Sequence, residues 1–189
     1  MPGDSLSGPL RRTLDEVLDA LAAAGARAAV AGGIAQQVWG RIRATRDLDL
    51  LVLSVAGEGP VVDALKARGL RATRKPKSIA AMTLHSFVRE DPEGFVDVPV
   101  DIFFVTSGLG PEAVERAVSL PVAGRAIPVV RAEDLLLLKL LADRVLDRAD
   151  AEDIVREQRD RLDVAYLRSR ASTLGLSAAL ERTFQAARD

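Results

Sequence analysis

The chain has 189 residues, with 26 Lys or Arg, 27 Asp or Glu and one His, so its formal net charge is −1. This balance produces no overall field that would attract nucleic acids or membranes, and 48% hydrophobic residues exclude global disorder. The absence of cysteine excludes disulfides, cysteine-ligated zinc and thiol catalysis, and the single histidine, His85, excludes a zinc site built from several histidines.

The first residues contain no basic region followed by an apolar core, so they do not form a secretory signal. The longest uncharged stretch, residues 28–40, has 13 residues and includes two glutamines, which makes it too short and too polar to cross a bilayer. We therefore expect a cytoplasmic protein without a membrane partner.

The first half of the chain alternates helix and strand. Apolar residues at helical spacing predict a helix over residues 10–24, which Gly25 ends. The elements predicted after it are a buried strand at 28–31, a short helix at 34–40, an apolar strand at 48–53 and a helix from Pro60 to about Arg68.

The second half begins with strands and ends with helices. The turn signal at residues 91–94 joins two extended segments, 79–89 and 95–105, into a predicted antiparallel pair. A shorter hairpin is expected around Gly124, and the pattern is helical from Arg131 to the end, with breaks near Asp147 and Gly175.

Early alternation followed by an antiparallel pair predicts an α+β fold with a mixed sheet and flanking helices. We expect residues 1–130 to form the α/β core and residues 131–189 to form a helical region packed on that core. A small second lobe is the alternative for these helices.

The strongest chemical signal is the pair Asp47 and Asp49, which enters the apolar strand. The period of a strand places both carboxylates on one face, roughly 7 Å apart at the backbone. Such charges repel and lose hydration beside apolar residues, and Mg²⁺, which prefers carboxylates together with phosphate oxygens, relieves both costs. An acidic turn at the start of a strand is the plainer interpretation of this pair alone.

Gly32 and Gly33 lie between a predicted strand and a predicted helix. Glycine allows close approach of a ligand to the backbone, and the free N–H groups of a helix start bind anions, although a simple tight turn also explains the pair. The short helix and its connector would bring the strand at 48–53 beside the first strand, so phosphate-binding amides and carboxylates would share one sheet edge.

A third carboxylate, Asp101, lies within an apolar strand pattern, where a charge is costly unless it is paired or bound to metal. A structural salt bridge explains it equally well in isolation, and Asp97 shares its face as an alternative. Lys139 follows an apolar run. Further along the chain, three acids recur every three residues, which places them near one side of a helix: Asp147, Asp150 and Asp153. A solvated, salt-bridged helix face is the alternative interpretation of these acids.

Together these residues resemble the minimal nucleotidyltransferase superfamily, which has the polymerase-beta-like fold. Its pattern of two small residues, an acid-x-acid pair and a later third acid is matched by Gly32-Gly33, Asp47-x-Asp49 and Asp101. Residues 32–35 with 43–50, and residues 139–153, are similar, more narrowly, to the abortive-infection AbiE-type toxins and their uncharacterised bacterial relatives.

The resemblance implies transfer of a nucleoside monophosphate from a nucleoside triphosphate to an acceptor. It implies Mg²⁺, with Mn²⁺ as an alternative, held by Asp47, Asp49 and Asp101, which act in catalysis together with Lys139. The residues it implies for nucleotide binding are Gly32, Gly33, Arg43, Thr45, Arg46, Asp150 and Asp153. Many members have serine where Gly33 stands, so a hydroxyl contact to phosphate is expected to be lost.

Three functions remain open. The first is a nucleotidyltransferase acting on tRNA or protein, in the role of the toxin of a toxin–antitoxin pair with an antitoxin partner. The second is the same chemistry on a small molecule such as an aminoglycoside, and the third is a non-catalytic nucleotide-binding or partner-binding module.

A basic stretch bears on the acceptor, since residues 68–77 contain five cations and no acid. It fits a nucleic acid backbone or, more plainly, an exposed loop that keeps the protein soluble, and the 4% of aromatic residues weaken a case for base stacking.

Overall fold

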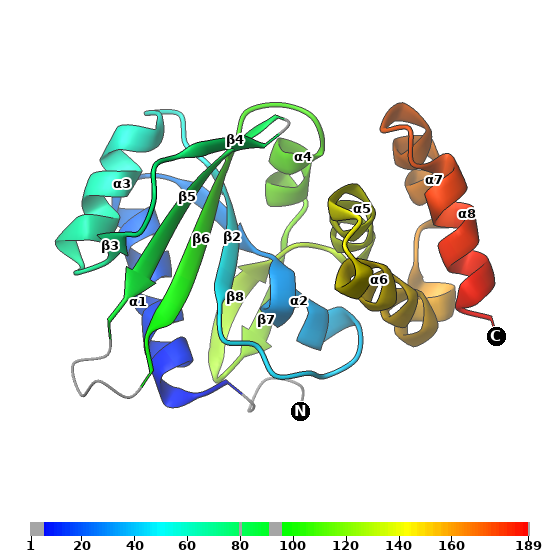
Figure 1. Ribbon diagram of the computed structural model, residues 1–189, viewed down its shortest axis with the longest axis horizontal. Coiled ribbons are helices and arrows are strands. Elements are labelled where there is room, and N and C mark those ends of the chain that lie inside the picture. The colour runs from blue at the N-terminus through cyan, green and yellow to red at the C-terminus, as the bar shows by residue number, and fades with distance from the viewer. Residues whose placement is uncertain (1–5, 80, 91–95, 189) are drawn as a thin grey trace.

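The computed structural model describes residues 6–79, 81–90 and 96–188. Within these residues eight strands form one sheet in the order β3-β5-β6-β2-β1-β8-β7, with β4 also paired to β5 (Figure 1). The strands are β1 (Arg27–Val30), β2 (Leu48–Leu53), β3 (Arg71–Ala72), β4 (Lys77–Ile79), β5 (Met82–Arg89), β6 (Val98–Val105), β7 (Val118–Val122) and β8 (Arg125–Val129). The helices are α1 (Gly8–Ala23), α2 (Gly32–Trp39), α3 (Glu58–Ala67), α4 (Leu109–Glu115), α5 (Ala132–Ala142), α6 (Val145–Gln158), the 3-10 helix η1 (Arg159–Arg161), α7 (Val164–Thr173) and α8 (Ser177–Ala186).

Strand β2 lies near the centre of the sheet, between β1 and β6. It pairs antiparallel with β1 and parallel with β6, while β5 pairs antiparallel with β6. The sheet is therefore mixed, and the α+β class with flanking helices that the sequence predicts is confirmed. The bounds of β2 coincide with those of the predicted strand, in which Leu48, Leu50 and Val52 are fully buried.

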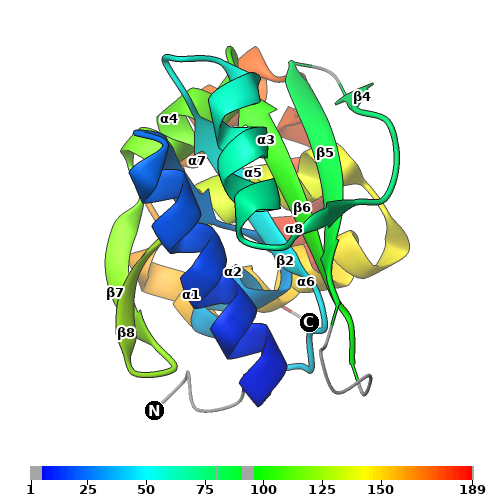
Figure 2. The ribbon, with the colours of Figure 1, turned by 90° about the vertical axis from the view of Figure 1, so that its left-hand side faces the viewer.

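The two faces of the sheet have different neighbours. Helices α1 and α3 cover one face, and α2, α4 and the C-terminal helices lie on the other side (Figures 1 and 2). His85 of β5 lies opposite Ile102 of β6, and its Nε2 is 2.7 Å from Oε2 of Glu58 in the first turn of α3. The strand side chains on the same face as His85 and Ile102 therefore face α1 and α3. Asp49 and Asp101 lie on the other face, that of α2 and α4, because successive side chains of a strand alternate between the two faces.

The C-terminal helices contact the core through α5, which packs against α2 and α4, and through α6, which packs against α2. Leu135, Leu136 and Leu137 of α5 are buried. A buried carboxylate, Asp134, bonds Arg116 and the hydroxyl of Tyr166 and so links α5 to both the core and α7. The predicted boundary at residues 130 and 131 lies between β8 and α5, and no described helix is long and apolar enough to cross a membrane.

Several local predictions were wrong. Helix α4 was not predicted, although Pro111 at its start is a helix-start signal. The predicted strand at 79–89 is confirmed as β5, which pairs antiparallel with β6 as expected, but Ile79 belongs to a separate strand, β4. The helical break expected near Asp147 lies instead at Asp143, whose φ is +51°, because Asp147 is suited to the first turn of the next helix.

A further break, at Arg159, was missed, whereas the one predicted at Gly175 is confirmed. The hairpin around Gly124 is confirmed as β7 and β8, whereas the turn signal at residues 91–94 lies outside the described residues.

Candidate active site

Two of the acids that the sequence singles out, Asp49 and Asp101, lie on one row that crosses the sheet, which we call the row of acids. Asp49 of β2 is in register with Asp101 of β6, and Asp101 is in register with Ser86 of β5. Residues in register on neighbouring strands project from the same face, with about 4.8 Å between strands. Asp101, rather than the alternative Asp97, is therefore the acid beside Asp49.

Gly32 allows the carboxylate of Asp49 to lie against the start of α2. The N–H of Ala31 donates to the carbonyl oxygen of Asp49 at 2.8 Å, and Gly32 has a φ of +53°. A Cβ at position 32 would lie 1.8 Å from Oδ2 of Asp49, so only glycine fits both the backbone conformation and the close approach. The predicted glycine bend and the acid are thus in direct contact.

Asp47 is located differently from its prediction. It lies in the loop before β2 and is exposed, and its Oδ1 accepts a hydrogen bond of 2.8 Å from the hydroxyl of Thr45. Asp47 therefore directly precedes the strand in which the prediction placed it, because that strand begins at Leu48. The loop still brings Asp47 close enough to raise the pKa of Asp49.

Thr45 also lies against Gly33. A Cβ at position 33 would be 2.4 Å from Oγ1 of Thr45, so the threonine hydroxyl occupies space that a serine side chain at position 33 would need. The sequence predicts loss of a hydroxyl here, and the structure places the hydroxyl of Thr45 beside Gly33 instead.

The surroundings of Asp49 disfavour its charged form. Burial raises the pKa of Asp49 from 3.8 to about 6, and the negative charges of Asp47 and Asp101 raise it further toward that value, while Lys139 and Arg144 lower it. No cationic side chain of the described residues bonds directly to Asp49 or Asp101. A cation entering this place would relieve both the repulsion and the lost hydration.

Lys139 is buried, and its Nζ donates hydrogen bonds to Oδ1 of Asp147 at 2.9 Å and to Oδ2 of Asp150 at 2.7 Å. Arg43, in the loop before β2, donates a hydrogen bond of 3.0 Å to Oδ2 of Asp150, and Arg144 donates to Asp147. We call these five residues the lysine cluster. It joins α5 and α6 to the loop that carries Asp47, and two of its cations, Lys139 and Arg144, act electrostatically on Asp49.

Two predicted nucleotide-binding residues lie apart from the lysine cluster. Asp153 pairs with Arg156 at 3.4 Å, and Arg46 is exposed in the loop before β2. Conversely, sequence reasoning assigned no role to Arg144 or to Ser86. Arg144 was visible only as part of the spacing after Lys139, whereas the buried hydroxyl of Ser86, which has no partner among the described residues, carries no sequence signal.

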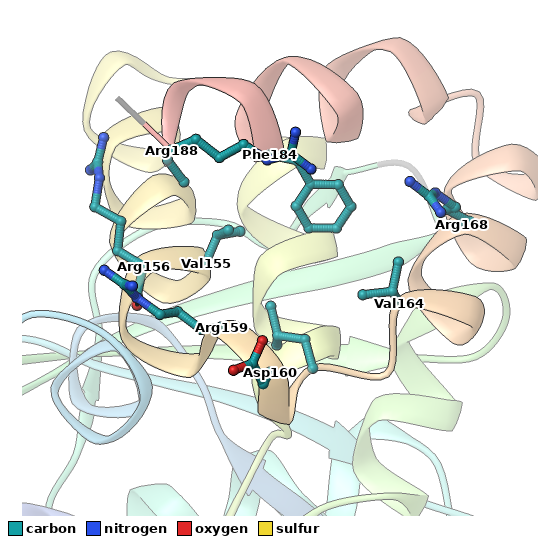
Figure 3. A pocket seen from close by; sticks show the side chains of 10 residues that line it. Val155, Arg156, Arg159, Asp160, Val164, Arg168, Phe184 and Arg188 are labelled. Carbon is teal, nitrogen blue, oxygen red and sulfur yellow. Dashed lines mark hydrogen bonds between the residues drawn. The ribbon is translucent and has the colours of Figure 1, made fainter.

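The C-terminal helices enclose a separate cavity of about 420 Å³, shown in Figure 3. Phe184 and Val164 line it together with four arginines, and it is bordered by α6, η1, α7 and α8. Arg156 is already paired with Glu152, and Arg168 with Glu181. None of the predicted site residues lines this cavity, so it is distinct from the row of acids.

Solved structures resemble the chain over most of its length. The antibiotic-resistance factor ANT(2'')-Ia aligns with a TM-score of 0.57 and 14% identity, over 93% of this chain and 96% of that chain. An antigenic nucleotidyltransferase-like protein from Paracoccidioides brasiliensis aligns with a TM-score of 0.51 and 17% identity, over 92% of each chain. The fold is that of the nucleotidyltransferases.

At these identities the likeness is one of fold, and the chemistry follows only from the residues of this chain. No protein-family model and no curated protein sequence matches the chain. The narrower resemblance to the AbiE-type toxins stays a prediction.

Replacing Asp49 with asparagine tests the electrostatic cost. At about pH 8, Asp49→Asn should be more stable than the wild type by up to about 3 kcal/mol, because the amide has the same shape and no charge. The folded pKa is about 6 and the unfolded value 3.8, so between these pH values the folded wild type binds the extra proton. The advantage of the variant should therefore be full above about pH 6 and vanish as the pH falls to about 4.

Urea unfolding at a series of pH values measures this difference. Asp63→Asn is the matched control, since Asp63 is exposed on α3, and it should follow the wild type. An Asp49→Asn protein that is no more stable than the wild type at about pH 8 would contradict the electrostatic description of the site.

Proposed function

We propose that the chain is a metal-dependent nucleotidyltransferase that moves a nucleoside monophosphate from a nucleoside triphosphate to an acceptor. One observation carries the proposal. Asp49 and Asp101 lie in register on neighbouring strands, without a direct cationic partner among the described residues, and Asp49 touches Gly32 at the start of α2. The carboxylates have no bonded cation and would bind a metal ion, while the N–H groups at the start of the helix beside them would bind a phosphate.

The donor chemistry of the site fits Mg²⁺, with Mn²⁺ as the alternative. Asp47, Asp49 and Asp101 supply carboxylate oxygens, which are the ligands that these ions prefer. The charges of Asp47 and Asp101 disfavour the charged form of Asp49, and a bound cation would remove that cost. No three ligating side chains of the described chain are already close enough to hold one ion, and Oδ1 of Asp47 accepts a hydrogen bond from Thr45. When bound, the ion would neutralise triphosphate charge and lower the pKa of the acceptor hydroxyl.

The residues of the chain have separate roles in the reaction. The amides at Gly32 and Gly33 bind phosphate oxygens, and the cations Lys139, Arg144 and Arg43 balance the charge that develops on the leaving group. The acceptor oxygen bonds to the α-phosphorus as the bond from that phosphorus to the bridging oxygen breaks, and pyrophosphate leaves with the electron pair. Asp101 accepts the proton of the acceptor hydroxyl.

The lysine cluster positions these groups. Asp147 and Asp150 hold the ammonium of Lys139, and Asp150 also holds Arg43, so loss of either acid would free Lys139 from one of its two carboxylate partners. The roles of Arg46 and Asp153 in nucleotide binding stay predictions, and Thr45 acts by fixing Asp47.

The proposed acceptor is tRNA or protein, and the proposed cellular role is that of the toxin in a toxin–antitoxin pair, with the antitoxin as partner. A small-molecule acceptor is the second candidate, because the similar fold of ANT(2'')-Ia belongs to an antibiotic-resistance factor. Retained nucleotide binding without transfer would instead indicate a non-catalytic module.

Exchange of one glycine tests the metal and phosphate site without measuring activity. Gly25 and Gly32 both have positive φ, but a Cβ at position 25 meets nothing within 4 Å, whereas one at position 32 displaces Asp49. Both alanine variants should lose about 1–2 kcal/mol of stability to backbone strain. Free Mg²⁺ at about ten times its dissociation constant should restore about 1.4 kcal/mol in the wild type and in Gly25→Ala, and nothing in Gly32→Ala.

Thermal unfolding with and without Mg²⁺ makes this comparison. An equal response to Mg²⁺ in the two glycine variants, or none in the wild type, would show that the ion does not bind beside Gly32.

Transfer itself is measured with nucleoside triphosphates labelled at the α-phosphate, in the presence of Mg²⁺. Each of total tRNA, a protein extract and an aminoglycoside is offered as acceptor, and label should appear on one of them with the wild type and with Asp63→Asn. Asp49→Asn should lose at least about 100-fold in rate while remaining folded, because the site would lose a carboxylate ligand of the divalent ion that would balance the phosphate charge. Persisting transfer by Asp49→Asn would place the active site elsewhere.

A further inference from the structure

The region opposite the C-terminal helices carries a concentrated positive charge. Residues 68–77 contain five cations and no acid, while the rest of the chain has 21 basic and 27 acidic residues. All described residues from 71 to 79 are exposed. We call residues 68–77 the cationic edge, because β3 and β4 lie at the edge of the sheet beside β5 (Figures 1 and 2).

The backbone of the cationic edge is fixed while its charges stay available. β3 and β4 both pair with β5, and between them the N–H of Thr73 donates to the carbonyl oxygen of Ser86 at 2.9 Å. Arg71 pairs with Glu90, but Arg74, Lys75 and Lys77 have no ion-pair partner among the residues that the structure describes. Exposed cations without ion-pair partners, carried between two paired strands, favour a polyanionic ligand.

The cationic edge continues the row of acids across the sheet. Thr73 bonds Ser86, Ser86 is in register with Asp101, and Asp101 is in register with Asp49. At about 4.8 Å between strands, Thr73 lies about 14 Å from Asp49 along this row. A chain bound at the cationic edge can therefore extend across β5 and β6 to the proposed site.

We propose that the cationic edge binds the phosphate backbone of a single-stranded nucleic acid, whose terminal hydroxyl is the acceptor beside Asp101. This inference rests on the proposed transferase function and selects among its acceptors. A nucleic acid supplies both the repeated anionic groups that Arg74, Lys75 and Lys77 would bind and the hydroxyl that the chemistry needs. A cationic small molecule would be repelled by the same surface.

Recognition by this edge is electrostatic and does not read the bases. The cationic edge contains no aromatic side chain on which a base could stack, and phosphate contacts carry no sequence information. Binding should therefore weaken steeply with salt, because each neutralised phosphate of a single strand releases about 0.7 of a counterion.

Fluorescence anisotropy with labelled single-stranded RNA and DNA oligonucleotides tests the proposal. Nucleoside triphosphate and divalent ions are left out, so the result does not depend on whether the protein transfers nucleotides. The test variant is Arg74→Gln/Lys75→Gln/Lys77→Gln. The control variant, Arg12→Gln/Arg161→Gln/Arg182→Gln, removes three exposed cations elsewhere on the chain.

The test variant should bind more than about tenfold more weakly at about 0.1 M salt, and its slope of log affinity against log salt should be smaller by about 2. The control variant should bind nearly as the wild type does, and circular dichroism should show all three proteins folded. An equal loss in both variants, an unchanged affinity in the test variant, or no binding at about 50 mM salt would overturn the proposal.

Poly-glutamate distinguishes the other class of macromolecule that a cationic surface attracts. If it binds the wild type as tightly as RNA and is equally weakened in the test variant, the edge recognises acidic protein segments, and the nucleic acid proposal is wrong.

Discussion

The candidate site depends on the burial of the Asp49 carboxylate beside a second acid, Asp101, that the sheet register places next to it. Asp49 and Asp101 are neighbours because β2 and β6 run parallel with Leu48 opposite Val100, and the same pairing buries the apolar residues of both strands. Burial of the apolar residues stabilises the fold, whereas burial of the Asp49 carboxylate destabilises its charged form and raises its pKa to about 6. Such a cost persists in a stable fold where a ligand relieves it.

The lysine cluster sets the charge that surrounds these acids. The two carboxylates of α6 hold the buried Lys139 of α5, and the half-buried Arg43 and the exposed Arg144 complete a network whose charges nearly balance. Removing one member would leave an uncompensated charge, which makes the network cooperative. Since Arg43 belongs to the loop before β2, the C-terminal helices and the core jointly fix the place of Asp47.

Much of the fold was predictable from the sequence because the apolar runs are unambiguous. The strand at 48–53 has the predicted bounds, and Gly32 and Asp49 meet as the spacing indicated. Helix α4 was missed because seven residues give too short a periodic pattern. Asp153 lies off the lysine cluster because three residues advance a helix by about 300°, so each acid turns about 60° away from the one before.

The remaining site features depend on contacts between distant segments, which periodicity cannot reveal. The hydroxyl of Thr45 beside Gly33 and the orphaned hydroxyl of Ser86 beside Asp101 are examples. The cationic edge was visible as composition, but its place on the row of acids follows only from the register of β5.

The most direct test of the account is the pKa of the Asp49 carboxyl, measured by carbon-13 NMR with and without Mg²⁺. The account predicts a value near 6 without the ion and a clear fall when Mg²⁺ is added, because the cation stabilises the charged form. A value near 4 without the ion, or one near 6 that Mg²⁺ leaves unchanged, would contradict it.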